Sequence, residues 1–84
     1  GTIVMHGAYV GPNVKIGKNC IINTKSHIEH DSIIGNNCHI STAVTINGNT
    51  KIEPDSFIGS NSVIKEGVIV KRGSFIKMGS VIKK

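Results

Sequence analysis

Residues 28–64 read IEHDSIIGNNCHISTAVTINGNTKIEPDSFIGSNSVI and place an isoleucine at every sixth position. The same period extends in both directions, and fourteen positions from Val4 to Ile82 hold only Ile or Val. A second column stands two residues before the first, from Thr2 to Ser80, and holds only Ser, Thr, Cys, Ala or Val. A fixed short period without a single slip is typical of a solenoid, in which each repeat is one small structural unit.

One hexapeptide is predicted to form one strand and one turn. Residues two apart in a strand point to the same side, so both columns face inward and the residue between them faces outward. Gly, Asn and Glu often follow the Ile/Val column, and the polar residues beside them favour a turn there. Three such sides close a triangular coil of about 18 residues, and successive coils stack about 4.8 Å apart. The sequence therefore predicts an all-β chain of about four to five triangular coils of parallel strands.

The composition agrees with many short strands and limits the classes of function. The chain has no Trp, one Tyr, two Phe and ten Gly, and no break in phase marks a linker, so residues 1–84 are predicted to form a single domain. The net charge of +5 favours anionic ligands, but the aromatic and Arg-rich patterns of nucleic-acid readers are missing, so no nucleic-acid partner is expected. Basic residues gather near the C-terminal end, at Lys65, Lys71, Arg72, Lys77, Lys83 and Lys84.

The sequence also bears on where the protein works. No apolar run reaches the roughly 20 residues that span a bilayer, and no signal-peptide pattern opens the sequence. We therefore expect no membrane association and a cytoplasmic protein. The repeat is already running at Gly1, so we expect the sequence to be a piece of a longer chain.

The outward positions of one side form an apolar stripe. Stepping by 18 residues gives Ile3, Ile21, His39, Phe57 and Phe75. A long apolar stripe on a solvated side usually marks a contact surface. Contact with further copies of the chain and cover by a flanking domain are both open interpretations.

Residues 23–32, NTKSHIEHDS, carry two histidines and two carboxylates, and no other stretch is so enriched. His30 falls in a turn, where the neighbouring Asp31 can orient its imidazole and stabilise the protonated ring. Gly48 lies one coil above His30 and leaves room for a ligand to approach the backbone. The alternative is a solvated turn without any chemistry.

Neither a metal nor a disulfide is expected. The spacing of His27, His30 and His39 matches no standard structural zinc pattern. Cys20 and Cys38 lie 18 residues apart in the inward column, where stacked coils would bring their Cα atoms within disulfide range. Buried reduced thiols are nevertheless the expectation for a cytosolic protein, and a disulfide remains the alternative.

The run IINTKSHIEHDSIIGNNCHIS, residues 21–41, resembles the active-site coil of the hexapeptide-repeat sugar acetyltransferases, namely the sialic-acid O-acetyltransferases and nucleotide-amino-sugar N-acetyltransferases. In that family an Asn, a His seven residues later, an acidic residue directly after it and a second His nine residues beyond the first recur together. These fall on Asn23, His30, Asp31 and His39. The resemblance covers the catalytic domain of the family and continues through four positions that match its acetyl-CoA groove: Ser41, Gly48, Gly59 and Gly79.

The resemblance implies a fold and an activity. The fold is a left-handed parallel β-helix, and the expected assembly is a homotrimer that buries the apolar stripe. The activity is transfer of an acetyl group from acetyl-CoA to an amine or hydroxyl of a sugar or sugar nucleotide. In this interpretation His30 is the general base and Asp31 orients it, while Asn23 and His39 position the acceptor or the thioester.

Acetyl-CoA is expected in a groove between subunits. Its pantetheine arm would follow three glycines in near register, Gly48, Gly59 and Gly79, and its phosphates would point toward the basic C-terminal coils. A non-catalytic β-helix scaffold or oligomerisation module is the alternative function, and binding of coenzyme A distinguishes the two.

Overall fold

Each hexapeptide forms a two-residue strand followed by a four-residue turn, as the period predicts. The computed structural model describes residues 1–84 and contains strands and turns but no helix, so it has no helix that could cross a membrane. The strands are β1 (Ile3–Val4), β2 (Tyr9–Val10), β3 (Lys15–Ile16), β4 (Ile21–Ile22), β5 (His27–Ile28), β6 (Ile33–Ile34), β7 (His39–Ile40), β8 (Thr45–Ile46), β9 (Lys51–Ile52), β10 (Phe57–Ile58), β11 (Val63–Ile64), β12 (Ile69–Val70), β13 (Phe75–Ile76) and β14 (Val81–Ile82).

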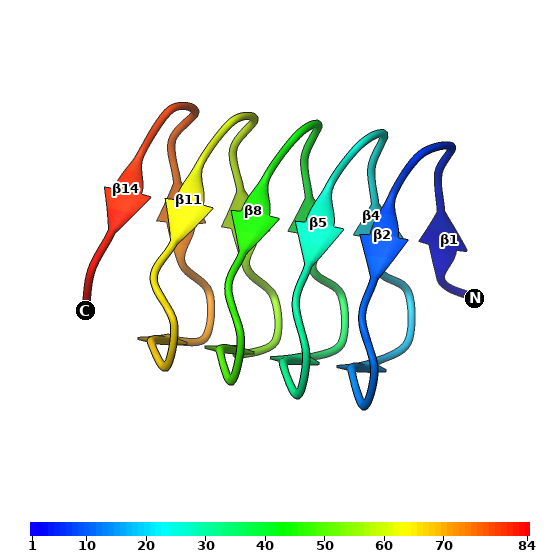
Figure 1. The fold of residues 1–84 in the computed structure, drawn as a ribbon, viewed down its shortest axis with the longest axis horizontal. Helices are drawn as coiled ribbons and strands as arrows, with labels where there is room; N and C mark the ends of the chain where they lie inside the picture. Colours follow the sequence, from blue (N-terminus) through cyan, green and yellow to red (C-terminus); the bar gives the residue numbers. More distant parts are fainter.

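The strands stack into three parallel sheets, which are the faces of a triangular prism. The first face is β1-β4-β7-β10-β13, the second is β2-β5-β8-β11-β14, and the third is β3-β6-β9-β12. Paired residues are 18 apart, as in Ile3 with Ile21 and Phe57 with Phe75. Figure 1 shows the chain winding left-handed from the N-terminus to the C-terminus. The fold is therefore the left-handed β-helix that the sequence and its resemblance predict.

Three corners separate the faces, and each is named by its residues. The first corner joins the first and second faces and comprises residues 5–8, 23–26, 41–44, 59–62 and 77–80. The second corner, residues 11–14, 29–32, 47–50 and 65–68, leads to the third face. The third corner, residues 17–20, 35–38, 53–56 and 71–74, returns to the first face.

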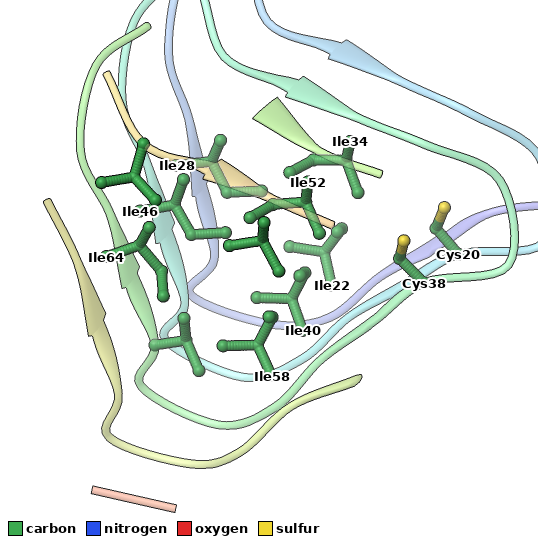
Figure 2. Close-up of a cluster of buried hydrophobic side chains, with 13 residues drawn as sticks. Cys20, Ile22, Ile28, Ile34, Cys38, Ile40, Ile46, Ile52, Ile58 and Ile64 are labelled. Carbon is green, nitrogen blue, oxygen red and sulfur yellow. The ribbon is translucent and has the colours of Figure 1, made fainter. Parts of the chain in front are cut away.

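The core is a stack of isoleucines from all three faces. Every residue of the Ile/Val column from Ile22 to Ile64 is buried, and these side chains fill the interior of the prism in Figure 2. Cys20 and Cys38 lie one above the other, buried and free, so the structure has reduced thiols rather than a disulfide.

The small inward residues also form hydrogen bonds between coils. Their hydroxyl or thiol groups donate to the backbone carbonyl fifteen residues ahead, which opens the same corner in the next coil. The Ser26 hydroxyl reaches the Ser41 carbonyl at 2.7 Å, and the Cys20 thiol reaches the Gly35 carbonyl at 3.1 Å. The full set of donors is Thr2, Cys20, Ser26, Ser32, Cys38, Thr50, Ser56 and Ser62. These bonds tie successive coils together in the buried part of each corner.

The third residue of every turn has a left-handed backbone. Positive φ values recur at every sixth residue from Gly7 to Gly79. Gly, Asn and Asp tolerate this region best, and they hold eleven of the thirteen positions. The exceptions are Lys25, with φ of 58°, and Ala43, also with φ of 58°. Both lie on the first corner in successive coils, so the strain is concentrated there.

Replacing Ala43 with glycine is expected to stabilise the protein. Glycine adopts the left-handed region without the steric cost of Cβ, which is roughly 1–2 kcal/mol, and loses part of that gain to its greater unfolded-state freedom. We expect the free energy of unfolding to rise by about 0.5–1 kcal/mol for Ala43→Gly, measured by urea denaturation. The neighbouring Thr42 has no positive φ, so Thr42→Gly is the matched control and should destabilise. Equal losses in both variants would contradict a strained turn at Ala43.

Candidate active site

The residues singled out in the sequence lie on two different corners of the prism. His30, Asp31 and Gly48 belong to the second corner. The others gather at the first corner, with Asn23, Ser41, Gly59 and Gly79 in its turns and His39 on β7, two residues before Ser41. The expectation that Gly48 stands in near register with Gly59 and Gly79 is therefore wrong within one chain, because eleven residues separate Gly48 from Gly59 whereas a coil takes eighteen.

His30 is held by its neighbour in the chain. The Nδ1 atom of His30 lies 3.0 Å from Oδ2 of Asp31, and both side chains are about half exposed. Asp31 occupies the left-handed turn position, with φ of 62°, which an aspartate tolerates. The hydrogen bond from Asp31 raises the pKa of His30 above its ordinary value of 6.5, and the negative charges of Asp31, Glu66 and Glu29 act in the same direction. Partial desolvation opposes them.

The imidazole of His30 lies against Gly48 of the next coil. A Cβ atom at position 48 would come 2.5 Å from Nε2 and 2.7 Å from Cε1 of the ring. Gly48 does not have a positive φ, so the turn itself does not demand glycine there. The glycine is needed for space. The sequence suggested that this space would admit a ligand, but the ring of His30 occupies much of it.

Gly48 also contributes an unused backbone donor. Its N–H makes no hydrogen bond within the chain, although Gly48 is buried. Most equivalent N–H groups of the other turns are unbonded as well, but they belong to residues that are not buried. Three are bonded to side chains: Lys18 to Asn36 at 2.8 Å, Thr24 to Asn23 at 2.7 Å and Arg72 to Glu53 at 3.0 Å. A free donor next to a free imidazole nitrogen is an arrangement that can bind a polar oxygen.

The first corner offers a second set of polar groups. The backbone N–H of Asn23 donates to the Ile40 carbonyl, which stacks Asn23 beneath Ser41. The Asn23 side-chain oxygen accepts the Thr24 N–H, and its amide NH₂ has no partner in the chain. The ring of His39 meets Phe57 edge-on at 5.2 Å, and its nitrogens make no hydrogen bond. Asn23 and His39 therefore keep donors and acceptors available to a ligand.

The two C-terminal glycines have structural explanations of their own. A side chain at Gly59 would collide with the backbone at Lys77 and Met78 of the next coil. Gly79 has a positive φ of 72° and stands in open space. Neither observation assigns a ligand to these positions.

The structure contains a second histidine–carboxylate pair, His27 and Glu29, which we did not predict from the sequence. Nε2 of His27 lies 2.5 Å from Oε2 of Glu29, and the ring of Tyr9 lies 4.6 Å from that of His27. The signal was available, because residues 27 and 29 flank one inward position and Tyr9 lies 18 residues before His27. No three His, Cys, Asp or Glu side chains converge as a metal site would require.

One chain does not unite the two sets of groups. Each coil leaves the first corner along a strand of the second face and reaches the second corner only at its far end, so β5 stands between Asn23 and His30 (Figure 1). No hydrogen bond or ion pair joins the two corners within the coil. A site that uses both sets must bring the first corner of one subunit to the second corner of another.

Comparison with known proteins identifies the repeat. No curated protein matches the chain. The family model for the bacterial transferase hexapeptide, which describes six repeats, matches residues 14–48 and 49–84. These matches cover most of the chain and coincide with the strands and turns of the prism. The chain therefore belongs to the bacterial transferase hexapeptide family.

Proposed function

We propose that the protein is an acetyltransferase that moves the acetyl group of acetyl-CoA to an amine or hydroxyl of a sugar or sugar nucleotide. The observation that carries the proposal is the arrangement at the second corner. Nδ1 of His30 is held by Asp31, and Nε2 stands over Gly48, whose N–H is free. A base and an oxyanion donor side by side are what acyl transfer requires.

The chemistry follows from these atoms. Asp31 keeps a proton on Nδ1 of His30, so Nε2 is the atom that accepts a proton from the attacking amine or hydroxyl. As the acceptor adds to the thioester carbonyl, the Gly48 N–H can donate to the oxygen that becomes negative. When the carbon–sulfur bond breaks, the proton on Nε2 passes to the departing thiolate. The residue thus serves as base and then as acid without net change.

The remaining groups fit the same reaction when a second subunit supplies them. Asn23 and His39 of a neighbouring subunit would position the acceptor or the thioester, with the free amide and ring nitrogens as contacts. The pantetheine arm would pass Gly48 of one subunit and Ser41, Gly59 and Gly79 of the other. The basic residues of the C-terminal coils would then meet the phosphates of coenzyme A.

A homotrimer is the assembly that this site needs. Residues of the first face, next to the first corner, form an outward apolar stripe in register, and Phe57 stacks on Phe75 with ring centroids 5.0 Å apart. Phe75 is 73% exposed in the single chain. Closed three-fold symmetry would bury the stripe and bring the first corner of each subunit to the second corner of the next.

Replacing the base, His30, should lower turnover greatly and leave the fold unchanged. His30 lies in a turn outside both inward columns, so His30→Ala opens no cavity in the core. In the full-length protein we expect turnover to fall by about 10²–10⁴-fold, measured as thiol release from acetyl-CoA with an amino-sugar nucleotide or a sialic acid as acceptor. Circular dichroism and light scattering should be unchanged. Near wild-type turnover would remove His30 from the mechanism.

The pH dependence should report the His30–Asp31 pair. Only the neutral imidazole accepts a proton, so kcat/KM should rise with pH as His30 deprotonates, with a midpoint above 6.5 because its pKa is raised. Asp31→Asn removes the main cause of that rise and keeps a residue that tolerates φ of 62°. The rise of kcat/KM with pH should then shift to lower pH, and the pKa of the His30 ring measured by NMR titration should fall by the same amount. A rise that stays in place would exclude His30 as the titrating base.

Mixed subunits test whether the site is shared. His30→Ala removes the base on the second corner, and Asn23→Ala removes the amide on the first corner. If each site takes one corner from each of two subunits, a random mixture of the two inactive variants should recover about one quarter of wild-type activity. Asn23→Ala mixed with His39→Ala, both on the first-corner side, should recover none. No recovery in the first mixture, with trimers verified by light scattering, would contradict a shared site.

The scaffold interpretation makes a different prediction for the same material. A non-catalytic β-helix would form the trimer but would bind no coenzyme A, so calorimetry with coenzyme A distinguishes it from the acetyltransferase. A Phe57→Glu variant, which places a charge in the apolar stripe, should dissociate the trimer and remove activity if the site is shared.

A further inference from the structure

Two strained turn residues stand together on the first corner. Lys25 and Ala43 are the only residues in left-handed turn positions that are not Gly, Asn or Asp. They are stacked in successive coils, since the N–H of Ala43 donates to the carbonyl of Thr24. An L residue with a full side chain in this region costs roughly 1–2 kcal/mol relative to glycine. Strain of this kind that the rest of the fold avoids often marks a functional position.

Lys25 is the more informative of the two because it brings a charge. Its side chain is exposed and belongs to none of the three ion pairs in the structure. Its stem lies over Gly7 of the preceding coil, where a Cβ would be 3.4 Å from Cγ of Lys25. Lys25 therefore combines a strained backbone with an ammonium group that has no ion-pair partner within the chain.

The position of Lys25 separates it from the other basic residues. Lys25 lies two residues after Asn23, in the same coil as His30, whereas most basic side chains belong to the C-terminal coils. In the shared site the first corner of one subunit faces the second corner of the next. The ammonium of Lys25 would then come from the subunit that supplies Asn23, several coils from the cluster that suits the phosphates of coenzyme A.

The second corner carries negative charges near His30, so a cation from the neighbouring subunit would favour the binding of an anionic acceptor. Asp31, Glu66 and Glu29 all act electrostatically on His30, so an acceptor that carries a negative charge would approach His30 against carboxylates. An ammonium from the neighbouring subunit offsets this repulsion and can donate to a phosphate or carboxylate oxygen. A neutral acceptor would gain nothing from it.

We infer that Lys25 is a specificity-determining residue that binds an anionic group, a phosphate or a carboxylate, on the acceptor. The inference rests on the proposed acetyl transfer and on its site between subunits. It gives a reason for a lysine at a position where the fold favours glycine or asparagine. It also requires opposite effects on stability and on binding when Lys25 is replaced by asparagine.

The decisive variant is Lys25→Asn in the full-length protein. Asparagine suits the left-handed turn, so its thermal midpoint should rise above that of the wild type. Affinity for glucosamine 1-phosphate should fall by about 10-fold or more, because a charge-assisted hydrogen bond is lost. Sialic acid, which carries a carboxylate instead, reports the other source of the anion, and at least one of the two must weaken. Uncharged glucosamine should bind equally to both proteins.

Two controls separate charge from strain. Lys25→Arg keeps the charge and should lose less affinity for the anionic sugars than Lys25→Asn does. Lys15→Asn removes an exposed lysine from the third face and should change neither affinity nor the acceptor KM. NMR shifts of the Lys25 and Asn23 amides on addition of each sugar give a readout that needs no turnover, so a failure of acetyl transfer remains distinguishable from a failure of anion binding.

Three outcomes would overturn the inference. The first is a stabilised Lys25→Asn protein whose affinity for both anionic sugars is unchanged. The second is a rise in KM for acetyl-CoA alone, which would assign the anion to coenzyme A. The third is an equal loss of affinity for uncharged glucosamine, which would mean that the substitution disturbs the corner rather than removing a charge contact.

Discussion

The eighteen-residue coil is the constraint on which the whole structure depends. Every strand pairs with the strand eighteen residues away, and a shift by one residue would exchange inward and outward side chains along the chain. Two local devices maintain the register. Three left-handed turn residues close each coil, and hydroxyl or thiol groups at the corners bond to the carbonyl fifteen residues ahead. A chain of only 84 residues with three aromatic side chains can therefore form a continuous buried isoleucine stack.

The period predicted the fold almost completely, because a six-residue repeat fixes the direction of every side chain. All fourteen strands fall where the Ile/Val column places them, and Cys20 and Cys38 are buried thiols. The candidate site was less predictable. Which corner a residue occupies depends on its number modulo eighteen, so Gly48 lies on the second corner whereas Gly59 and Gly79 lie on the first, and the expected near register of the three glycines does not hold within one chain. The ring of His30 over Gly48 depends on a side-chain rotamer, which the sequence does not contain, whereas the two-residue spacing of His27 and Glu29 could have predicted their pairing.

The separation of the two corners means that the proposed site would need a second subunit. No loop interrupts the prism, and backbone hydrogen bonds join its coils, so the chain has no flexible segment that could bring Asn23 to His30. The groups left without partners in one chain, namely the Asn23 amide, the His39 ring and the Gly48 N–H, lie on surfaces that a three-fold neighbour could cover. Assembly would then supply both the burial of the apolar stripe and the completion of the site. Stability and activity would depend on the same contact.

At the second corner, the packing of one turn depends on a glycine. The second residue of a turn has an N–H that the ladder leaves unbonded, and at Lys18, Thr24 and Arg72 a side chain satisfies it. A side chain at position 48 would have to enter the space that the His30 ring occupies. Glycine removes this steric conflict, so the His30 ring lies against a residue whose N–H is unbonded, and this is the pair that the proposed base and oxyanion donor would use.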